Sequence, residues 1–400
     1  MINYETYINK LKEYHLINPI YLYLLDFIEE ELKDNIETYL TLFSIYFSLL
    51  SEGNVCMSLD KEKLLNKWNE KLSSTFILLN SKCEYNEEKY NSFKEYSISI
   101  IDNYLQEINE TNLPNLIGDN KIFVIDNNWL YLKKYNDSRL SIIKSIKRLF
   151  NKKLSNQSIF DYKKYVIDSF CLSNGQIQAV NDGVCKDLII TGGPGCGKTT
   201  SILFLLINLL LNDFESEVYL VAPSGKASSR MKESIINGLS NLNDDFKNKH
   251  PKLIEKINNL QESTIHRLIG IDFDGKYKYN KNKQFKPNSI FIIDEASMID
   301  ICMFDALLQA IPSSARIFMM GDKNQLPSVE CGAVFSDLLN AQFLQDNIIE
   351  LDESIRFSKD TKIFELANAI NTGAELPVNA SMWNNSQCFE IKQERKENRS

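Results

Sequence analysis

The stretch that most constrains this chain is a glycine-rich loop set between two apolar runs. Residues 188–200 read Leu-Ile-Ile-Thr-Gly-Gly-Pro-Gly-Cys-Gly-Lys-Thr-Thr. Residues 192–199 fit G-x-x-x-x-G-K-[S/T], the phosphate-binding loop that joins a buried strand to a helix. Glycines let backbone N–H groups turn toward an anion, and the positive end of the helix faces the same point. The pattern predicts a strand at 188–190, a helix from Thr200 and a phosphate site between them; a simple glycine turn is the alternative.

Two side chains of this loop have the chemistry that nucleotide phosphates need. Lys198 would reach the β- and γ-phosphates, and the Thr199 hydroxyl would hold Mg²⁺. The residues expected to bind ATP are Gly192, Gly193, Pro194, Gly195, Cys196, Gly197, Lys198, Thr199 and Thr200, together with Gln176 upstream as a weak candidate for the adenine edge. The Cys196 thiol is a possible site of oxidation, and nothing requires it as a catalyst.

A second strong signal is an acidic pair at the end of another apolar run. Residues 290–293 predict a central strand, and Asp294 and Glu295 follow it directly. Asp294 would bind Mg²⁺ through water, and Glu295 would polarise the attacking water; a helix cap is the alternative. A further strand at 316–320 leads to Gln325, which is placed to sense the γ-phosphate. Arg356 is a candidate arginine finger.

Basic residues occur in three places whose meaning differs. A strand at 218–222 ends in small residues and Lys226, which suits phosphate contact because ligands gather at the carboxyl edge of α/β sheets. Residues 276–283 alternate lysine with tyrosine, so they fit either a grip on single-stranded nucleic acid or a solvated insertion. A basic helix at 138–154 is interpreted as having a solvated face.

Composition limits the class of protein. The chain has 400 residues, 44% of them hydrophobic, and a net charge of -8, so it is expected to be soluble and to hold two or three domains. With no overall basic excess, any grip on nucleic acid has to come from local patches. No cysteine pair has metal-site spacing, no signal peptide is visible, and the apolar run 40–47 is too short to span a bilayer. A cytoplasmic protein without a membrane partner is expected.

The domain organisation follows from these motifs. Residues 1–110 are expected to form a helical, partner-docking domain, since they carry apolar faces but no catalytic residues. Residues 111–170 would form a linker with a β-hairpin at 122–132 and the basic helix. Residues 171–350 would form an α/β domain with a parallel sheet, and 351–400 the start of a further domain.

Six stretches in this order resemble the motifs of superfamily 1 DNA helicases. Their residues are similar to those of the RecD family, the α subunits of the bacterial RecBCD helicase–nuclease (exonuclease V). The stretches are residues 192–200, 222–227, 264–270, 294–298, 321–326 and 354–357. The resemblance implies a RecA-like P-loop motor domain behind a helical N-terminal domain, and an ATP- and Mg²⁺-dependent 5′→3′ motor on DNA. It also implies RecB-like and RecC-like partners at DNA ends, in double-strand-break repair and recombination.

The resemblance also implies roles for single residues, and this sequence differs from the family in length. Gln176 would contact adenine, Gln325 and Arg356 would couple hydrolysis to motion, and the DNA contacts would be Pro223, Ser224, Gly225, Lys226, Thr264, His266 and Arg267. Family members continue well beyond this chain into a second RecA-like lobe, so only its start is expected at 351–400. A truncated, nucleotide-binding assembly subunit without motor activity therefore stays open. A metabolic kinase is disfavoured, because Gln325 and Arg356 lie in motor-type motifs, and no nuclease motif is visible.

Overall fold

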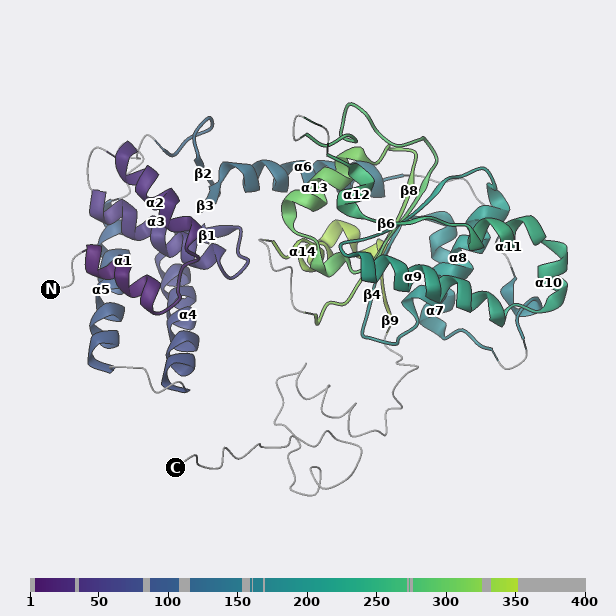
Figure 1. The fold of residues 1–400 in the computed structure, drawn as a ribbon, viewed down its shortest axis with the longest axis horizontal. Helices are drawn as coiled ribbons and strands as arrows, with labels where there is room; N and C mark the ends of the chain where they lie inside the picture. Colours follow the sequence, from purple (N-terminus) through teal and green to yellow (C-terminus); the bar gives the residue numbers. More distant parts are fainter. Residues whose placement is uncertain are drawn as a thin grey trace, which may run out of the picture.

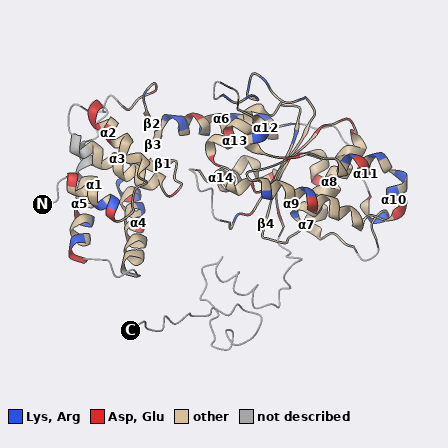
Figure 2. Ribbon diagram, viewed as in Figure 1, with Lys and Arg blue, Asp and Glu red and all other residues tan. Residues whose placement is uncertain are grey.

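A computed structural model describes residues 4–32, 36–81, 87–107, 116–152, 159, 161–167, 170–271, 273, 276–325 and 332–351. The chain forms a helical N-terminal part and an α/β domain, and the long helix α6 (Lys133–Phe150) runs from the first to the second (Figure 1). Basic and acidic residues are interspersed along the helices of both parts (Figure 2). Within the described ranges, no helix has the length and apolar character needed to cross a membrane.

The N-terminal part packs helices against a small antiparallel sheet. Its helices are α1 (Tyr4–Glu13), α2 (Ile20–Glu31), α3 (Ile36–Leu50), α4 (Lys61–Ser81) and α5 (Glu87–Glu107). Its strands are β1 (Cys56–Ser58), β2 (Phe123–Asp126) and β3 (Trp129–Leu132), in the order β1-β3-β2. Helix α3 is buried along its described length from Leu40 to Leu50, as its apolar composition predicts. The helical character predicted for this part is confirmed.

The predicted hairpin is present and belongs to this sheet. Strands β2 and β3 pair antiparallel, and the turn residues Asn127 and Asn128 have φ of 49° and 66°. Two left-handed residues are what the tight turn of a twisted hairpin requires, and asparagine tolerates that conformation. Because β3 also pairs with β1, a boundary near residue 110 separates strands of one sheet. The division into domains stays a prediction.

Helix α6 is anchored by Arg148 and by Lys152, which lies just past its end. Lys144 is exposed, as expected for a solvated face. In contrast, the Arg148 guanidinium donates to the Ile311 carbonyl oxygen (2.8 Å), and just past the helix the Lys152 ammonium pairs with Asp187 (2.9 Å). The interpretation of the basic helix as a solvated face is therefore wrong for Arg148 and Lys152. They attach α6 to the α/β domain.

The α/β domain has a six-stranded sheet in the order β6-β5-β7-β8-β4-β9, with every pairing parallel. The strands are β4 (Leu188–Gly192), β5 (Val218–Ala222), β6 (Glu262–Thr264), β7 (Ile290–Ile293), β8 (Arg316–Gly321) and β9 (Ile348–Leu351). The helices are α7 (Asn174–Cys185), α8 (Lys198–Asn212), α9 (Gly225–Gly238), α10 (Asp244–Lys249), α11 (Pro251–Asn258), α12 (Ile265–Ile269), α13 (Ile301–Ala310) and α14 (Val334–Asn340). Short 3-10 turns are η1 (Tyr162–Lys164), η2 (Leu239–Asn241), η3 (Ala296–Met298) and η4 (Gln342–Asn347).

Helices cover both faces of this sheet. Successive strand residues point to opposite faces, so Ile189 and Phe291 join the core on the side of α12, α13 and α14, whereas Ile190 and Ile292 join the core on the side of α7, α8 and α9. Helix α8 is buried from Ser201 to Leu210, as an apolar helix between the sheet and its neighbours must be. The predicted α/β class with a parallel sheet is confirmed.

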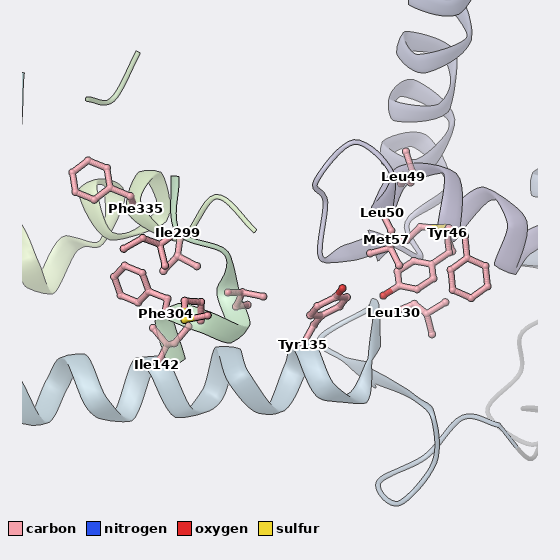
Figure 3. Packing of buried hydrophobic residues seen from close by; sticks show 14 of the residues in the cluster. Tyr46, Leu49, Leu50, Met57, Leu130, Tyr135, Ile142, Ile299, Phe304 and Phe335 are labelled. Atoms are coloured by element: carbon pink, nitrogen blue, oxygen red, sulfur yellow. The ribbon is translucent and has the colours of Figure 1, made fainter. Parts of the chain in front are cut away.

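The core on the α13 side continues into the N-terminal part. One hydrophobic cluster contains Met57 and Leu130 of the small sheet and Phe304 and Phe335 of the α/β domain. Figure 3 shows its two halves along α6, with Tyr135 near the start of the helix and Ile142 further on. The N-terminal part and the α/β domain thus share apolar packing.

Candidate nucleotide-binding site

The glycine-rich loop joins β4 to α8 as predicted. Gly195 and Gly197 have φ of 80° and 78°, a left-handed conformation in which a side chain is strained. Helix α8 begins at Lys198, two residues before the predicted start, so its N-terminal N–H groups face the loop. Strand, loop and helix have the arrangement that the sequence predicts, and anion binding by the loop stays a prediction.

Lys198 folds back over its own loop. Its ammonium donates to the carbonyl oxygens of Gly192 (2.6 Å) and Gly193 (3.1 Å). Phosphate oxygens are stronger acceptors for an ammonium than carbonyl oxygens, because they carry charge. A bound nucleotide would replace these two contacts, so the lysine is already positioned over the loop.

Gln176 braces the loop from beneath. Gln176 is only 1% exposed. It forms a capping box with Ser173, whose backbone N–H donates to Gln176 Oε1 (2.8 Å). Its Nε2 donates to the carbonyl oxygens of Cys196 (3.4 Å) and Gly197 (3.3 Å). This bracing role was missed in the sequence, although the Ser-Asn-Gly-Gln spacing of a capping box was visible. The contact of Gln176 with adenine stays a prediction.

Asp294 and Glu295 follow β7 at a place that disfavours the charged form of Asp294 and strains the backbone of Glu295. Burial raises the pKa of Asp294 to about 6, and the Glu295 carboxylate adds to this rise. Two groups oppose it: the Glu295 N–H, which donates to Asp294 Oδ1 (2.9 Å), and the Lys198 ammonium. Glu295 has φ of 51°, which is strained for a residue with a side chain. A half-buried carboxyl with a raised pKa next to a strained backbone is typical of functional sites.

Three neighbouring strands bring the predicted residues to one edge. Strands β7, β8 and β4 are adjacent and parallel, so Asp294, Gln325 and Lys198 follow them at the same carboxyl edge. The Lys323 N–H donates to Thr191 Oγ1 (3.3 Å), which ties the segment after β8 to the end of β4. Gln325 is exposed there, and Arg356 lies outside the described residues.

The residues predicted to touch DNA lie side by side at the same edge. Ser224 caps α9 through the Ala227 N–H (3.2 Å), and Thr264 caps α12 through the Arg267 N–H (3.2 Å). A Cβ added to Gly225 would lie 4.0 Å from Thr264 Cγ2. The exposed side chains here are Ser224, Lys226, His266 and Arg267, and Pro223 is half-buried between them and β5. The fold therefore joins two motifs that lie forty residues apart in the sequence (Ser224 to Thr264).

The basic loop at 276–283 presents lysines rather than tyrosines. The Tyr279 ring stacks on Phe285 with 4.2 Å between centroids. Lys278 and Lys283 are exposed, and their ammonium groups lie 5.7 and 5.8 Å from the Tyr279 centroid. Tyr279 thus has a packing role, and the choice between a grip on nucleic acid and a solvated insertion stays a prediction.

Comparison with known proteins agrees with this geometry. A family model described as an AAA domain matches residues 176–331. The RecBCD enzyme subunit RecD of Haemophilus influenzae is 36% identical over 216 residues, which cover 46% of this chain and 33% of that protein. RecD of Mycobacterium tuberculosis (strain CDC 1551 / Oshkosh) is 31% identical over 202 residues, covering 49% and 33%. The ATP-dependent RecD2 DNA helicase of Deinococcus radiodurans is 29% identical over 186 residues, covering 46% and 22%.

The chain spans about a third of the length of the RecD relatives that it matches. Among solved structures, Bacteroides Pif1 bound to ssDNA is 19% identical, with a TM-score of 0.30 over 54% of this chain and 49% of that one. The strand–loop–helix at 188–212 and the acidic pair after β7 lie within the stretch that matches the AAA domain model. The α/β domain is a RecA-like P-loop NTPase domain, and over the matched residues the chain is similar to RecD proteins.

Proposed function

We propose that this chain is an ATP-dependent 5′→3′ DNA translocase and helicase subunit of a RecBCD-type complex that acts at double-strand breaks. The observation that carries the proposal is the meeting of Lys198, Asp294 and Gln325 at the ends of three adjacent strands. A phosphate loop, an acidic pair and a glutamine on neighbouring strands are the parts that nucleoside triphosphate hydrolysis needs. The similarity to RecD proteins supports the same assignment.

ATP would bind with its phosphates on the loop between β4 and α8. The Lys198 ammonium would leave the carbonyls of Gly192 and Gly193 for the β- and γ-phosphates. A hydroxyl from Thr199 and a carboxylate from Asp294 are hard oxygen donors, the set that Mg²⁺ prefers. A cation would favour the charged form of the half-buried Asp294 carboxyl, whose pKa is raised. Bound Mg²⁺ would neutralise phosphate charge. Glu295 would take a proton from the attacking water, and Gln325 would orient that water.

DNA would pass along the carboxyl edge next to β5 and β6. The first turn of α9, behind Ser224, directs backbone N–H groups toward this edge, and Lys226 and Arg267 add exposed positive charge. These contacts reach the phosphate backbone, so the grip would not depend on base sequence. Gln176, beneath the loop, would rotate toward the adenine edge only on nucleotide binding, and Arg356 would supply charge to the γ-phosphate.

The partners would be RecB-like and RecC-like subunits, in the cytoplasm, with residues 1–110 docking the complex. The RecD relatives carry the name of RecBCD enzyme subunits, which supports such an assembly. The alternative is a nucleotide-binding assembly subunit without motor activity of its own. The two functions differ in whether single-stranded DNA accelerates ATP hydrolysis.

The test is ATP hydrolysis by the 400-residue chain and by its complex with the two partner subunits, with and without an oligothymidylate. Acceleration by the oligonucleotide, and separation of a duplex with a 5′ overhang but not a 3′ overhang, would support the motor. Lys198→Ala should lower hydrolysis by roughly 10²–10³-fold, whereas Lys252→Ala, which replaces an exposed lysine on α11, should leave hydrolysis unchanged. Nucleotide binding without any acceleration in the full complex would favour the assembly subunit instead.

A further inference from the structure

The N-terminal part touches the chain just beyond the candidate site. The Gly332 N–H donates to the Gly53 carbonyl oxygen (2.8 Å), and Gly53 ends the turn that follows α3. Gly332 has φ of +112°, and a Cβ added there would lie 2.9 Å from the Cβ of Ile301, the first residue of α13. No side chain fits at Gly332, so the chain is held between the N-terminal turn and α13. We name the Gly53–Gly332 contact the clasp.

Helix α14 begins two residues after the clasp and supports the acidic pair and the end of β8. It packs against η3, the turn directly after Asp294 and Glu295. Its Phe335 is 2% exposed, and the ring fills the space beside the last residue of β8: a Cβ on Gly321 would lie 2.7 Å from two ring carbons. Figure 3 shows Phe335 beside Ile299, which follows η3. Phe335 is thus wedged between the segment that follows η3 and the end of β8.

The same helix also faces the N-terminal part. Burial raises the pKa of Asp337 on α14, and the charge of its carboxylate contributes to the raised pKa of the Cys56 thiol on β1, after burial of the thiol. The clasp and this proximity place α14 between the N-terminal part on one side and η3 with the end of β8 on the other. A strained residue such as Glu295 keeps its conformation only while its surroundings hold it. The packing around Glu295 therefore includes α14, the helix that the N-terminal part contacts.

We propose that the N-terminal part positions Glu295, the candidate base for the attacking water, and Gln325, the candidate γ-phosphate sensor, with Gly332 and Phe335 as the positioning residues. The inference rests on the proposed function, because it needs a γ-phosphate at this site. It makes the N-terminal part a contributor to nucleotide discrimination as well as a docking module. By linkage, a ligand that prefers one arrangement of η3 must also change the stability of the clasp.

The first test compares the affinities of the 400-residue chain for ADP and for AMP-PNP, a triphosphate that is not hydrolysed. Gly332→Ala and Phe335→Leu should weaken AMP-PNP binding about fivefold or more and leave ADP binding within about twofold, since only the γ-phosphate end is disturbed. Gly118→Ala is the matched control: its φ is +150°, and the nearest atom to the new Cβ is Lys121 Cγ at 3.5 Å. It should change neither affinity.

A second pair of variants tests the wedge itself. Gly321→Ala alone drives a Cβ into the Phe335 ring, and Phe335→Leu alone leaves a void. Together they should restore AMP-PNP affinity toward the wild-type value, because the smaller side chain makes room for the new methyl group. Losses that simply add in the double variant would contradict a positioning role for Phe335.

Hydrogen exchange on the wild-type chain gives a readout that needs no substitution. Amides of residues 51–54 and 332 should exchange more slowly with AMP-PNP bound than with ADP bound. A wild-type chain that binds neither nucleotide would refute the proposed function and this inference with it. Nucleotide binding with unchanged preference in Gly332→Ala and Phe335→Leu, and equal exchange in both complexes, would overturn the inference alone.

Discussion

Replacing Asp294 by asparagine should stabilise the nucleotide-free chain at neutral pH while it removes activity. Asparagine has nearly the same shape, and its oxygen can still accept the bond from the Glu295 N–H. The folded pKa of Asp294 is about 6, against an ordinary value of 3.8. Between these values the folded chain holds a proton that the unfolded chain has released, so stability falls as the pH rises through this window.

The size of the effect follows from the shift. A difference of 6 minus 3.8 is about 2 pKa units, and each unit corresponds to about 1.4 kcal/mol, so the ionised carboxyl costs at most about 3 kcal/mol above pH 6. The neutral amide of the Asp294→Asn variant would not carry this cost. The variant should therefore match wild type near pH 4 and become more stable by roughly 1–3 kcal/mol near pH 7.5, or about 2–4 °C in Tm for each kcal/mol.

The assay is thermal unfolding of both proteins across this pH range without nucleotide or Mg²⁺. Asp245→Asn, which replaces an exposed carboxyl on α10, is the control and should show no pH-dependent gain. With saturating ATP and Mg²⁺ the order should reverse, because the ligands stabilise only a protein that binds them. A difference between Asp294→Asn and wild type that stays constant from pH 4 to pH 7.5 would refute the reasoning.

Three further outcomes are expected. Lys198→Ala should keep the circular dichroism spectrum and lower ATP hydrolysis by roughly 10²–10³-fold, as loss of one preorganised charge contact does; unchanged DNA-stimulated hydrolysis in the complete complex would rule out its phosphate role. Glu295→Gln should leave the Kd for ATP within about twofold and slow single-turnover hydrolysis by roughly 10²–10⁴-fold, as expected for a general base; weaker ATP binding instead would assign the residue to affinity. Arg316→Met should lower the free energy of unfolding, measured in urea, by about 3–5 kcal/mol, because Arg316 Nε donates to the buried Asp187 carboxylate at 2.9 Å. Adding Asp187→Asn should recover part of this loss of stability. If the losses of the two single variants simply add in the double variant, an unpaired buried charge is not the cause.

The candidate site could be predicted because its signals are local. A glycine loop between a strand and a helix, or an acidic pair after four apolar residues, lies within about a dozen residues of sequence. Backbone sterics decide these features, as the left-handed Gly195 and Gly197 and the Asn127–Asn128 turn show. The order of apolar strands also predicted a parallel sheet, since successive strands separated by helices form no other common arrangement.

Local signals gave no access to contacts between distant residues. Lys152 and Arg316 both meet Asp187, and this network changes a presumed solvated helix into an anchor between the two parts of the chain. The sequence left open what the tyrosines of residues 276–283 do, and the fold packs Tyr279 on Phe285. Burial decides the role of such side chains, and burial is a property of the assembled core.

The sequence alone determined which residues are the candidates for nucleotide chemistry, because side-chain chemistry and short-range backbone geometry depend on adjacent residues. Only the tertiary structure decided how those residues are held. Gln176 braces a loop that begins sixteen residues later in the sequence, at Gly192. Gly332 donates a hydrogen bond to Gly53, although α6 and most strands of the large sheet lie between them in the sequence. Such pairings depend on which apolar faces pack together, and that choice is made by the whole core at once.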